Sequence, residues 1–512
     1  MPALRAFLEG ERYMADGLWS DAEKAFARAI EADSAFWLAY WRHVYARNFQ
    51  SMPEDPALYG ALWLHRTQLH GVDSLLLAAD QGPGVGRLSV ALSLGEEVTR
   101  RYPDNWWAWF YYADYLVHQG PRLGHDSREA RAALERTLAL NPRLPEAWAH
   151  LLMVTVGQDS AVSATAFEEL RRVSPDPLRV RWERQFAVLD QDGGVVDTAL
   201  ADSVERDAGG PSIVAHNLAA FFLMYGFPAA QIGWDRRMIR RGGSRAYTQL
   251  YRLTLAYAWA ARGAWDSALV AAEDYGAWAG LNGASMDPLA GYRVAVIGAW
   301  IGALDASAAR RWRPSPGSTA TATPVVKAEL AWLDGMLAVT RRDRPALSSA
   351  RAALAQSGDS AWHVIDRSLG AFALDLAGER RRAADSLAAI EWQRPDFEPA
   401  VDGLNGARSH PFLAGVDRMA GAAWFLQDGD TTDATRLLVW HECRVWSLRV
   451  HVADAVFAGL ADLQLARVED AQGHADLAGH YYRQFLRRYD QPLPTQRHLV
   501  TEARVALARL RS

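Results

Sequence analysis

The chain has 512 residues, of which 50% are hydrophobic and 22% are charged, and its formal net charge at pH 7 is -5. This balance is typical of a folded protein and excludes disorder along the whole chain. The negative charge also excludes the strongly basic character that attracts a nucleic-acid backbone, so we expect no nucleic-acid partner. Only Lys24 and Lys327 are lysines among the 55 basic residues, so arginine clusters stand on an arginine-rich background.

Nothing in the sequence indicates a membrane or an oxidising compartment. Cys443 is the single cysteine, which excludes a disulfide within the chain and an all-cysteine metal site. The longest apolar stretches, near residues 219–225 and 294–304, are shorter than the about 20 residues of a membrane helix. The first residues enter an amphipathic helix without the pattern of a secretory signal. We therefore expect a cytoplasmic protein without membrane insertion.

From the N-terminus onward, one helical hairpin recurs. A small residue, a large apolar residue, a glycine turn, a second small residue and further apolar residues follow one another at Gly10, Tyr13, Gly17, Ala22, Phe26 and Ala29. The same spacing returns from Trp109, from Ala256, at residues 367–395 in its most complete form, from Ala422 and from Asp462. Each occurrence predicts two antiparallel helices joined at glycine, and one hairpin needs neighbours of its kind to bury its apolar faces.

These repeats predict four parts of the chain. We expect an N-terminal array at 1–177 and irregular helical repeats at 178–312 that include a clear unit near 249–279. A Pro/Ser/Thr/Ala-rich linker or loop follows at 313–324, and a C-terminal array at 325–512. The last helix, predicted at 496–510, would cover the final apolar face of the array.

The spacing of small residues, aromatic residue, glycine turn and closing proline resembles the tetratricopeptide repeat, with its period of 34 residues. The resemblance implies an all-α solenoid, a right-handed superhelix of antiparallel helix pairs with a C-terminal capping helix. It also implies that partner segments bind in the concave groove lined by the first helix of each pair. Residues 4–11 and 481–491 resemble the repeat halves of bacterial signalling proteins that carry a kinase or winged-helix domain upstream. Such a domain is not found in this sequence.

One subset of that family clamps a carboxylate with Lys and Asn on the first helices, and this chain departs from it. Phe7 and Glu11 stand at the corresponding positions of the first unit, and Phe110 and Asp114 in the unit that begins at Trp109. The resemblance therefore implies a groove that is aromatic or acidic rather than basic.

The aromatic run at 106–112 is the first candidate binding surface. Six aromatic residues among seven cannot all face one side of a helix, so Trp106, Trp107, Phe110 and Tyr111, with Asp114, are candidate partner-binding residues. The competing interpretation, which we favour, is that these rings fill gaps between repeats. A third interpretation makes the same run the site of a receptor for a small molecule or glycan.

The second candidate surface is basic. Arg236, Arg237, Arg240 and Arg241 lie within six residues, and arginine pairs well with phosphate or with carboxylates. On an arginine-rich background, a solvated helix face explains them more simply.

The sequence offers no motif for chemistry. The glycine-rich loop at 82–86 lacks the Lys and Ser/Thr of a phosphate loop, and His441, Cys443 and His451 lack metal-ligand spacing. No serine or cysteine lies in a nucleophile elbow. We therefore expect no catalytic residue, cofactor or metal, and interpret the chain as a non-catalytic protein-interaction or sensory scaffold in bacterial signalling. An enzyme would need distant acidic or histidine side chains to converge.

Overall fold

The computed structural model describes residues 2–50, 55–80, 88–191, 194–199, 202–203, 222–242, 245–283, 287–315, 317, 322–358, 362–390, 410–444 and 448–510. The chain divides into two compact units, which are described separately. Unit 1 consists of Met1–Gly193 and Asp197–Val204, and unit 2 of Gly194–Val196 and Glu205–Ser512.

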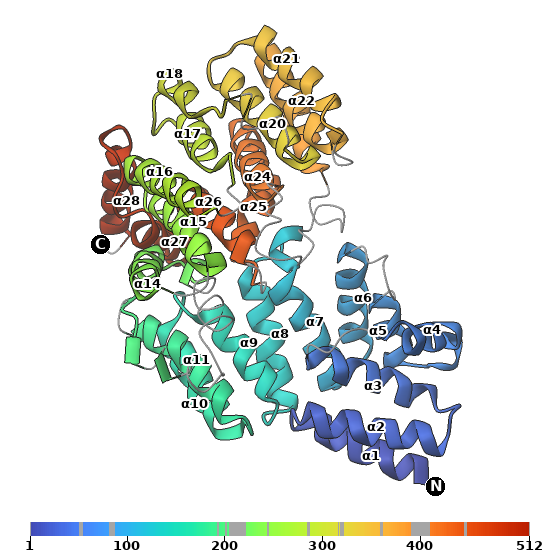
Figure 1. The fold of residues 1–512 in the computed structure, drawn as a ribbon. Helices are drawn as coiled ribbons and strands as arrows, with labels where there is room; N and C mark the ends of the chain where they lie inside the picture. The colour runs from blue at the N-terminus through green and yellow to red at the C-terminus, as the bar shows by residue number, and fades with distance from the viewer. Residues whose placement is uncertain are drawn as a thin grey trace. The chain divides into compact units, whose positions relative to one another are not determined.

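Unit 1 is built from helices that pack against their neighbours in the chain (Figure 1). The first helices of its successive pairs are α1 (Pro2–Ala15), α3 (Trp37–Phe49), α5 (Val72–Asp80), α7 (Trp106–His118), α9 (Pro145–Thr155) and α11 (Pro177–Gln191). The second helices are α2 (Trp19–Ala32), α4 (Pro56–Leu64), α6 (Leu88–Arg101), α8 (Ser127–Leu140) and α10 (Ser160–Val173), with short 3₁₀ turns η1 (Arg66–Gln68) and η2 (Gly120–Leu123).

Unit 2 continues the same plan. It begins with α14 (Pro228–Arg241), α15 (Arg245–Ala261), α16 (Trp265–Asn282), α17 (Ala290–Trp300), α18 (Ala306–Ala309), η3 (Arg310–Trp312), α20 (Pro324–Thr340) and α21 (Arg344–Ala355). It continues with α22 (Trp362–Ala377), α23 (Arg380–Ala388), α24 (His410–Gln427), α25 (Thr431–Leu438), η4 (Val439–Glu442), α26 (Leu448–Ala471), α27 (Ala475–Arg488), η5 (Pro494–Gln496) and α28 (Arg497–Arg509). In both units, every regular element among the described residues is helical.

Local sequence explains where the helix pairs turn. Five of the glycines predicted at the turns have positive φ, a conformation that side chains with a Cβ rarely adopt: Gly17, Gly263, Gly378, Gly429 and Gly473. Gly120, predicted at the turn after Trp109, instead begins the 3₁₀ turn η2. Aspartate commonly begins the second helix, as in α8, α10, α21 and α25, where its carboxylate accepts a backbone N–H of the first turn. The hairpin pattern in the sequence therefore corresponds to real helix boundaries.

The turn between α1 and α2 packs back on α9 within unit 1. The Trp19 indole nitrogen donates to Glu146 Oε1 at 2.7 Å, and the Asn141 side-chain amide donates to the carbonyl oxygen of Ala15 at 2.9 Å. A Cβ on Gly17 would lie 2.7 Å from Pro145 Cδ, so the two turns meet closely. Helix α9 also packs against α8 and α10, and it is buried along nearly its whole length.

Unit 2 also contains a long-range contact between helices. Helix α15 lies beside α26, although some 200 residues separate them in the chain. The backbone N–H groups of Gln491 and Leu493 donate to the carbonyl oxygens of Arg262 and Gly263, at 2.9 and 3.3 Å. These bonds join the loop before α28 to the turn between α15 and α16. Helix α28 then packs on α27, as expected of a capping helix.

The all-α fold of antiparallel helix pairs with a final capping helix is confirmed by these contacts. The chain divides near residues 193–205, and the segments on both sides of 313–324 belong to unit 2. Residues 316 and 318–321 of the predicted linker lie outside the described residues, and the four-part division stays a prediction.

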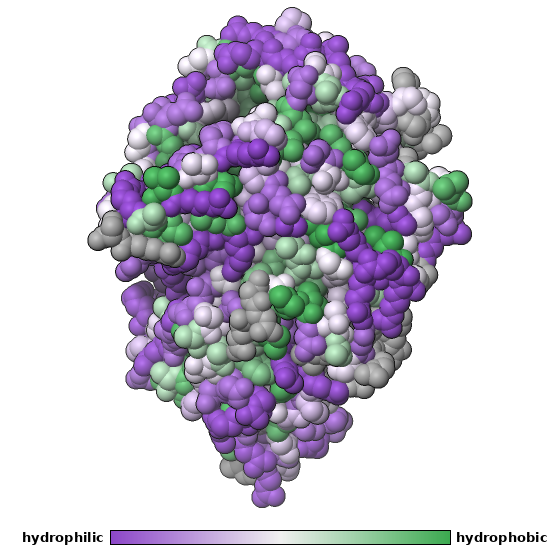
Figure 2. All heavy atoms as spheres, turned by 90° about the vertical axis from the view of Figure 1, so that its left-hand side faces the viewer, coloured by the Kyte–Doolittle hydropathy of each residue, from purple (hydrophilic) through white to green (hydrophobic). Residues whose placement is uncertain are grey.

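One face of the molecule is mainly polar (Figure 2). On the face drawn in Figure 2, hydrophilic residues cover most of the area, and hydrophobic residues gather in small separate groups. This distribution is what amphipathic helices give when their apolar stripes are buried. Among the described residues, no helix combines the length and apolar character that crossing a membrane requires.

Candidate functional sites

Polar contacts link consecutive first helices at nearly one repeat period. Arg42 on α3 pairs with Glu11 on α1, at 2.7 Å, and with Asp73 on α5. Arg179 on α11 pairs with Glu146 on α9, again at 2.7 Å. The residues in these pairs are 31 to 33 positions apart in the chain. Unit 1 therefore carries a series of paired charges between neighbouring first helices.

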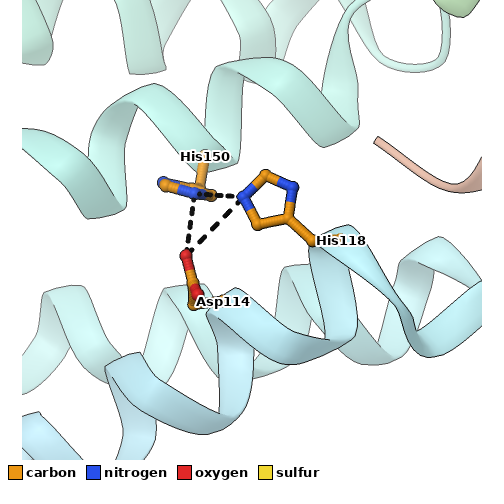
Figure 3. A group of neighbouring side chains, drawn as sticks. All are labelled: Asp114, His118 and His150. Carbon is orange, nitrogen blue, oxygen red and sulfur yellow. Dashed lines mark hydrogen bonds and ion pairs between the residues drawn. The ribbon is translucent and has the colours of Figure 1, made fainter. Parts of the chain in front are cut away.

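One member of this series brings three possible metal ligands together: Asp114, His118 and His150. Asp114 and His118 are four residues apart on α7, which puts them on the same face of the helix. His150 projects from α9 toward both of them (Figure 3). One ligand atom from each residue lies within 4.8 Å of the others.

The individual distances in this cluster are short. The two imidazole Nε2 atoms are 3.0 Å apart. Asp114 Oδ1 lies 3.2 Å from His150 Nε2 and 3.6 Å from His118 Nε2. The other ring nitrogen of His150, Nδ1, lies 2.7 Å from the carbonyl oxygen of Glu146, to which it donates. That bond leaves Nε2 of the neutral ring as the atom with a free lone pair.

Burial and charge act in opposite directions on this cluster. Burial alone would raise the pKa of Asp114, but the hydrogen bond from His150 and the charges of His118 and His150 lower that pKa below its ordinary value. Burial would likewise lower the pKa of His150, but its hydrogen bond to Asp114 and the Asp114 charge raise it. The cluster therefore stabilises an ionised carboxylate beside imidazole.

The aromatic run on α7 lies mostly inside unit 1. Trp107, Phe110 and Tyr111 are 2%, 0% and 2% exposed, whereas Trp106 is only partly buried. The Trp107 ring contacts Tyr45, with the centroids 4.3 Å apart. Phe110 lies next to Phe49, which stacks on Trp19. Burial favours the gap-filling interpretation over a partner or glycan surface, and the binding role of these residues stays a prediction.

The four predicted arginines lie on the last turns of α14. Arg236, Arg240 and Arg241 are exposed, and Arg237 is partly buried. The guanidinium carbon of Arg236 lies 5.2 Å from the ring centroid of Trp259 on α15, and that of Arg262 lies 5.5 Å from the same ring. The structure therefore brings a partly exposed aromatic ring to the basic surface.

The sequence reasoning selected Asp114 but missed His118 and His150. Two signals were present: the four-residue step from Asp114 to His118, and the position of His150 one repeat later. The histidine that was considered for metal binding, His441, is buried, and its Nε2 lies 2.8 Å from Asp462 Oδ1. That pairing holds the His441 ring against Asp462 inside unit 2. The side chain of His451 lies outside the described residues.

No protein family model matches this chain, and no curated protein matches its sequence. Solved structures similar to the chain include the TPR domain of P58(IPK), with 14% identity over 86% of this chain and 99% of that chain, and a TM-score of 0.21. Yeast Tom70 has 13% identity over 99% and 96% of the two chains, with a TM-score of 0.28. A chain of Naa15/Naa10 bound to HypK-THB has 13% identity over 99% and 79%, with a TM-score of 0.22. At these TM-scores, the fold assignment rests on the helix pairs of this chain.

Proposed function

We propose that the chain is a non-catalytic helical-repeat scaffold that binds an acidic segment of a partner protein at the C-terminal end of α14. The observation that carries the proposal is the pair Arg236 and Arg240. Both are exposed, and neither forms an ion pair with any described residue. They are four positions apart, so both face the same side of the helix.

Two arginines on the surface of α10 differ in this respect. Arg171 and Arg172 on α10 each pair with a glutamate three residues earlier, at 2.7 Å. The charges of such pairs are partly neutralised within the chain. Arg236 and Arg240 keep their charge available, and the neighbouring ring of Trp259 offers apolar contact to the same ligand.

The filled interior of unit 1 supports a surface outside the concave groove. Helix α9, which would line the groove, is buried by its neighbours and by the α1–α2 turn. The sequence resemblance of residues 4–11 and 481–491 supports a cytoplasmic role in bacterial signalling, which we include in the proposal. Arginine-rich contact with a flexible acidic segment gives binding that weakens with salt.

The test compares two double variants that lose the same charge. In Arg236→Ala/Arg240→Ala, the proposed surface is removed. In Arg497→Ala/Arg504→Ala, two exposed arginines of α28 are removed instead. Anisotropy of a fluorescein-labelled, glutamate-rich peptide measures binding at low and at physiological salt, and circular dichroism checks that both variants stay helical.

We expect the first variant to bind about tenfold or more weakly, since a hydrogen bond to a charged group contributes about 1.5 to 3 kcal/mol. The α28 variant should bind within about twofold of the intact protein, because its arginines lie on a different helix from Arg236 and Arg240. Equal losses in both variants, or no salt-sensitive binding by the intact protein, would contradict the proposed surface.

A further inference from the structure

We propose that Asp114, His118 and His150 bind one divalent transition-metal ion of the zinc class and thereby link two consecutive repeats of unit 1. The ligands are one carboxylate and two imidazoles, which converge from α7 and α9 (Figure 3). This site is independent of the arginine surface on α14.

The spacing of the three ligand atoms fits one ion. Two atoms bound to a tetrahedral zinc ion at about 2.1 Å lie roughly 3.4 Å from each other. The three distances between ligand atoms here are 3.0, 3.2 and 3.6 Å. The cluster therefore has the dimensions of three corners of a coordination tetrahedron without any change of backbone.

The donor set also suits a cation between its members. Two imidazole Nε2 atoms face each other at 3.0 Å, beside a carboxylate oxygen. A neutral His118 that carries its proton on Nε2 donates to His150 Nε2. A metal ion in place of that proton would bind both imidazoles and the carboxylate at once. In the metal-free chain, the N–H···N hydrogen bond joins the two rings.

The surroundings of His150 resemble the support that metal-binding histidines receive. Its Nδ1 donates to the Glu146 carbonyl oxygen at 2.7 Å, which fixes the ring and directs Nε2 toward the cluster. Glu146 is itself fixed, since its side chain accepts from Trp19 and Arg179, each at 2.7 Å. The orientation of the His150 ring is thus determined before an ion binds.

The site combines shielding with access. The side chain of His150 is 9% exposed, that of His118 19% and that of Asp114 26%. Solvent therefore reaches the carboxylate edge, through which an ion can enter. Three protein ligands leave a fourth position for water or for a group of another molecule.

Ligand chemistry selects the class of metal. Imidazole nitrogen suits zinc, copper, nickel and cobalt, whereas magnesium and calcium prefer all-oxygen surroundings. We therefore expect strong discrimination between Zn²⁺ and Mg²⁺. Co²⁺ serves as a spectroscopic probe, because its visible absorption distinguishes tetrahedral from octahedral coordination.

The experiment uses the full chain after chelator treatment and dialysis. Isothermal calorimetry with Zn²⁺ should show one tight equivalent per chain, at least about 100-fold tighter than Mg²⁺. His118→Ala should weaken Zn²⁺ binding at least about 100-fold. Asp114→Asn, which keeps the size of the side chain, should weaken it at least about tenfold and guards against misfolding of the alanine variant.

The matched control is His125→Gln. His125 also pairs with a carboxylate in unit 1, Glu129 at 2.9 Å, but it lies outside the cluster. This variant should bind Zn²⁺ within about twofold of the intact protein and keep its Co²⁺ spectrum. Absence of a tight equivalent in the intact protein, or equal affinity in the intact protein and His118→Ala, would show a hydrogen-bonded cluster only and overturn the proposal.

Discussion

The indole nitrogen of Trp265 lies 3.2 Å from the hydroxyl oxygen of Tyr489, although 224 positions separate the two residues in the chain. Trp265 begins α16, and Tyr489 directly follows α27. Their contact is one of several that hold the last repeat of unit 2 against its early helices, α15 and α16. Both side chains are buried, at 1% and 0% exposure.

Removal of the Tyr489 hydroxyl tests how much this long-range contact stabilises the protein. In Tyr489→Phe, the Trp265 N–H loses its acceptor, and the Gln496 side chain loses the hydroxyl that donates to it. Leaving buried polar groups unpaired costs about 1 to 3 kcal/mol, so the free energy of unfolding in urea should fall by that amount. Tyr13→Phe is the control, because that hydroxyl makes a local bond within α1 and its loss should cost under about 0.5 kcal/mol. If both variants lost the same free energy of unfolding, the contact between Trp265 and Tyr489 would contribute nothing to stability.

Alanine substitutions at two glycine turns distinguish the cost of backbone strain from the cost of a clash with the loop before α28. Gly263 and Gly378 have φ of 81° and 91°, so alanine is strained at both, by about 1 to 2 kcal/mol. A Cβ on Gly263 would also lie 2.8 Å from the Tyr489 ring and 3.0 Å from Pro492 Cα, whereas nothing lies within 4 Å at Gly378. We expect Gly263→Ala to destabilise the protein by about 1 to 3 kcal/mol more than Gly378→Ala in urea unfolding. If both variants lost nearly the same free energy of unfolding, the loop that contains Pro492 would lie farther from the Gly263 turn.

The burial of Trp107 predicts a structural effect of its replacement. Its ring contacts Tyr45 and lies 5.4 Å from the guanidinium carbon of Arg42. Trp107→Ala should therefore reduce the free energy of unfolding by about 3 to 5 kcal/mol. Leu64→Ala, at a side chain that is 73% exposed, should change it by under about 0.5 kcal/mol. If Trp107→Ala kept full stability but lost a partner, the ring would belong to a binding surface instead.

The raised pKa of Asp417 predicts how the free energy of unfolding changes with pH. Burial on α24 raises the pKa of Asp417 to about 8, despite the hydrogen bond that its carboxylate accepts from Ser368 at 2.7 Å. In the unfolded chain the same group has a pKa of about 4, so between about pH 4 and pH 8 the folded state binds the extra proton. The contribution of Asp417 to the free energy of unfolding is therefore largest below about pH 4, and it is lost as the pH rises toward 8.

Asp417→Asn should remove that dependence. The free energy of unfolding of the variant, measured in urea across this range, should fall less with rising pH than that of the intact protein. Ser368→Ala is the control, because it removes the hydrogen bond but leaves the titrating group in place. A variant Asp417→Asn with an unchanged slope would mean that this carboxyl group stays ionised in the folded protein.

The sequence by itself determined the local structure. Glycine turns, small residues at helix crossings and apolar stripes act within one hairpin, so the helix pairs and the last helix, α28, were predictable from their spacing. The face of α7 that carries Asp114 was predictable for the same reason.

Only the tertiary structure decided which hairpins meet. Small rotations between repeats add up along the array, and the sequence of one repeat does not record their sum. The pairing of Trp265 with Tyr489 and the packing of Trp19 on α9 depend on that sum. The convergence of His150 with Asp114 and His118 depends on how α9 is rotated against α7, since neighbouring helices can pack through several faces. The repeat period places these residues on adjacent helices, but side-chain packing between the helices decides that their ligand atoms meet.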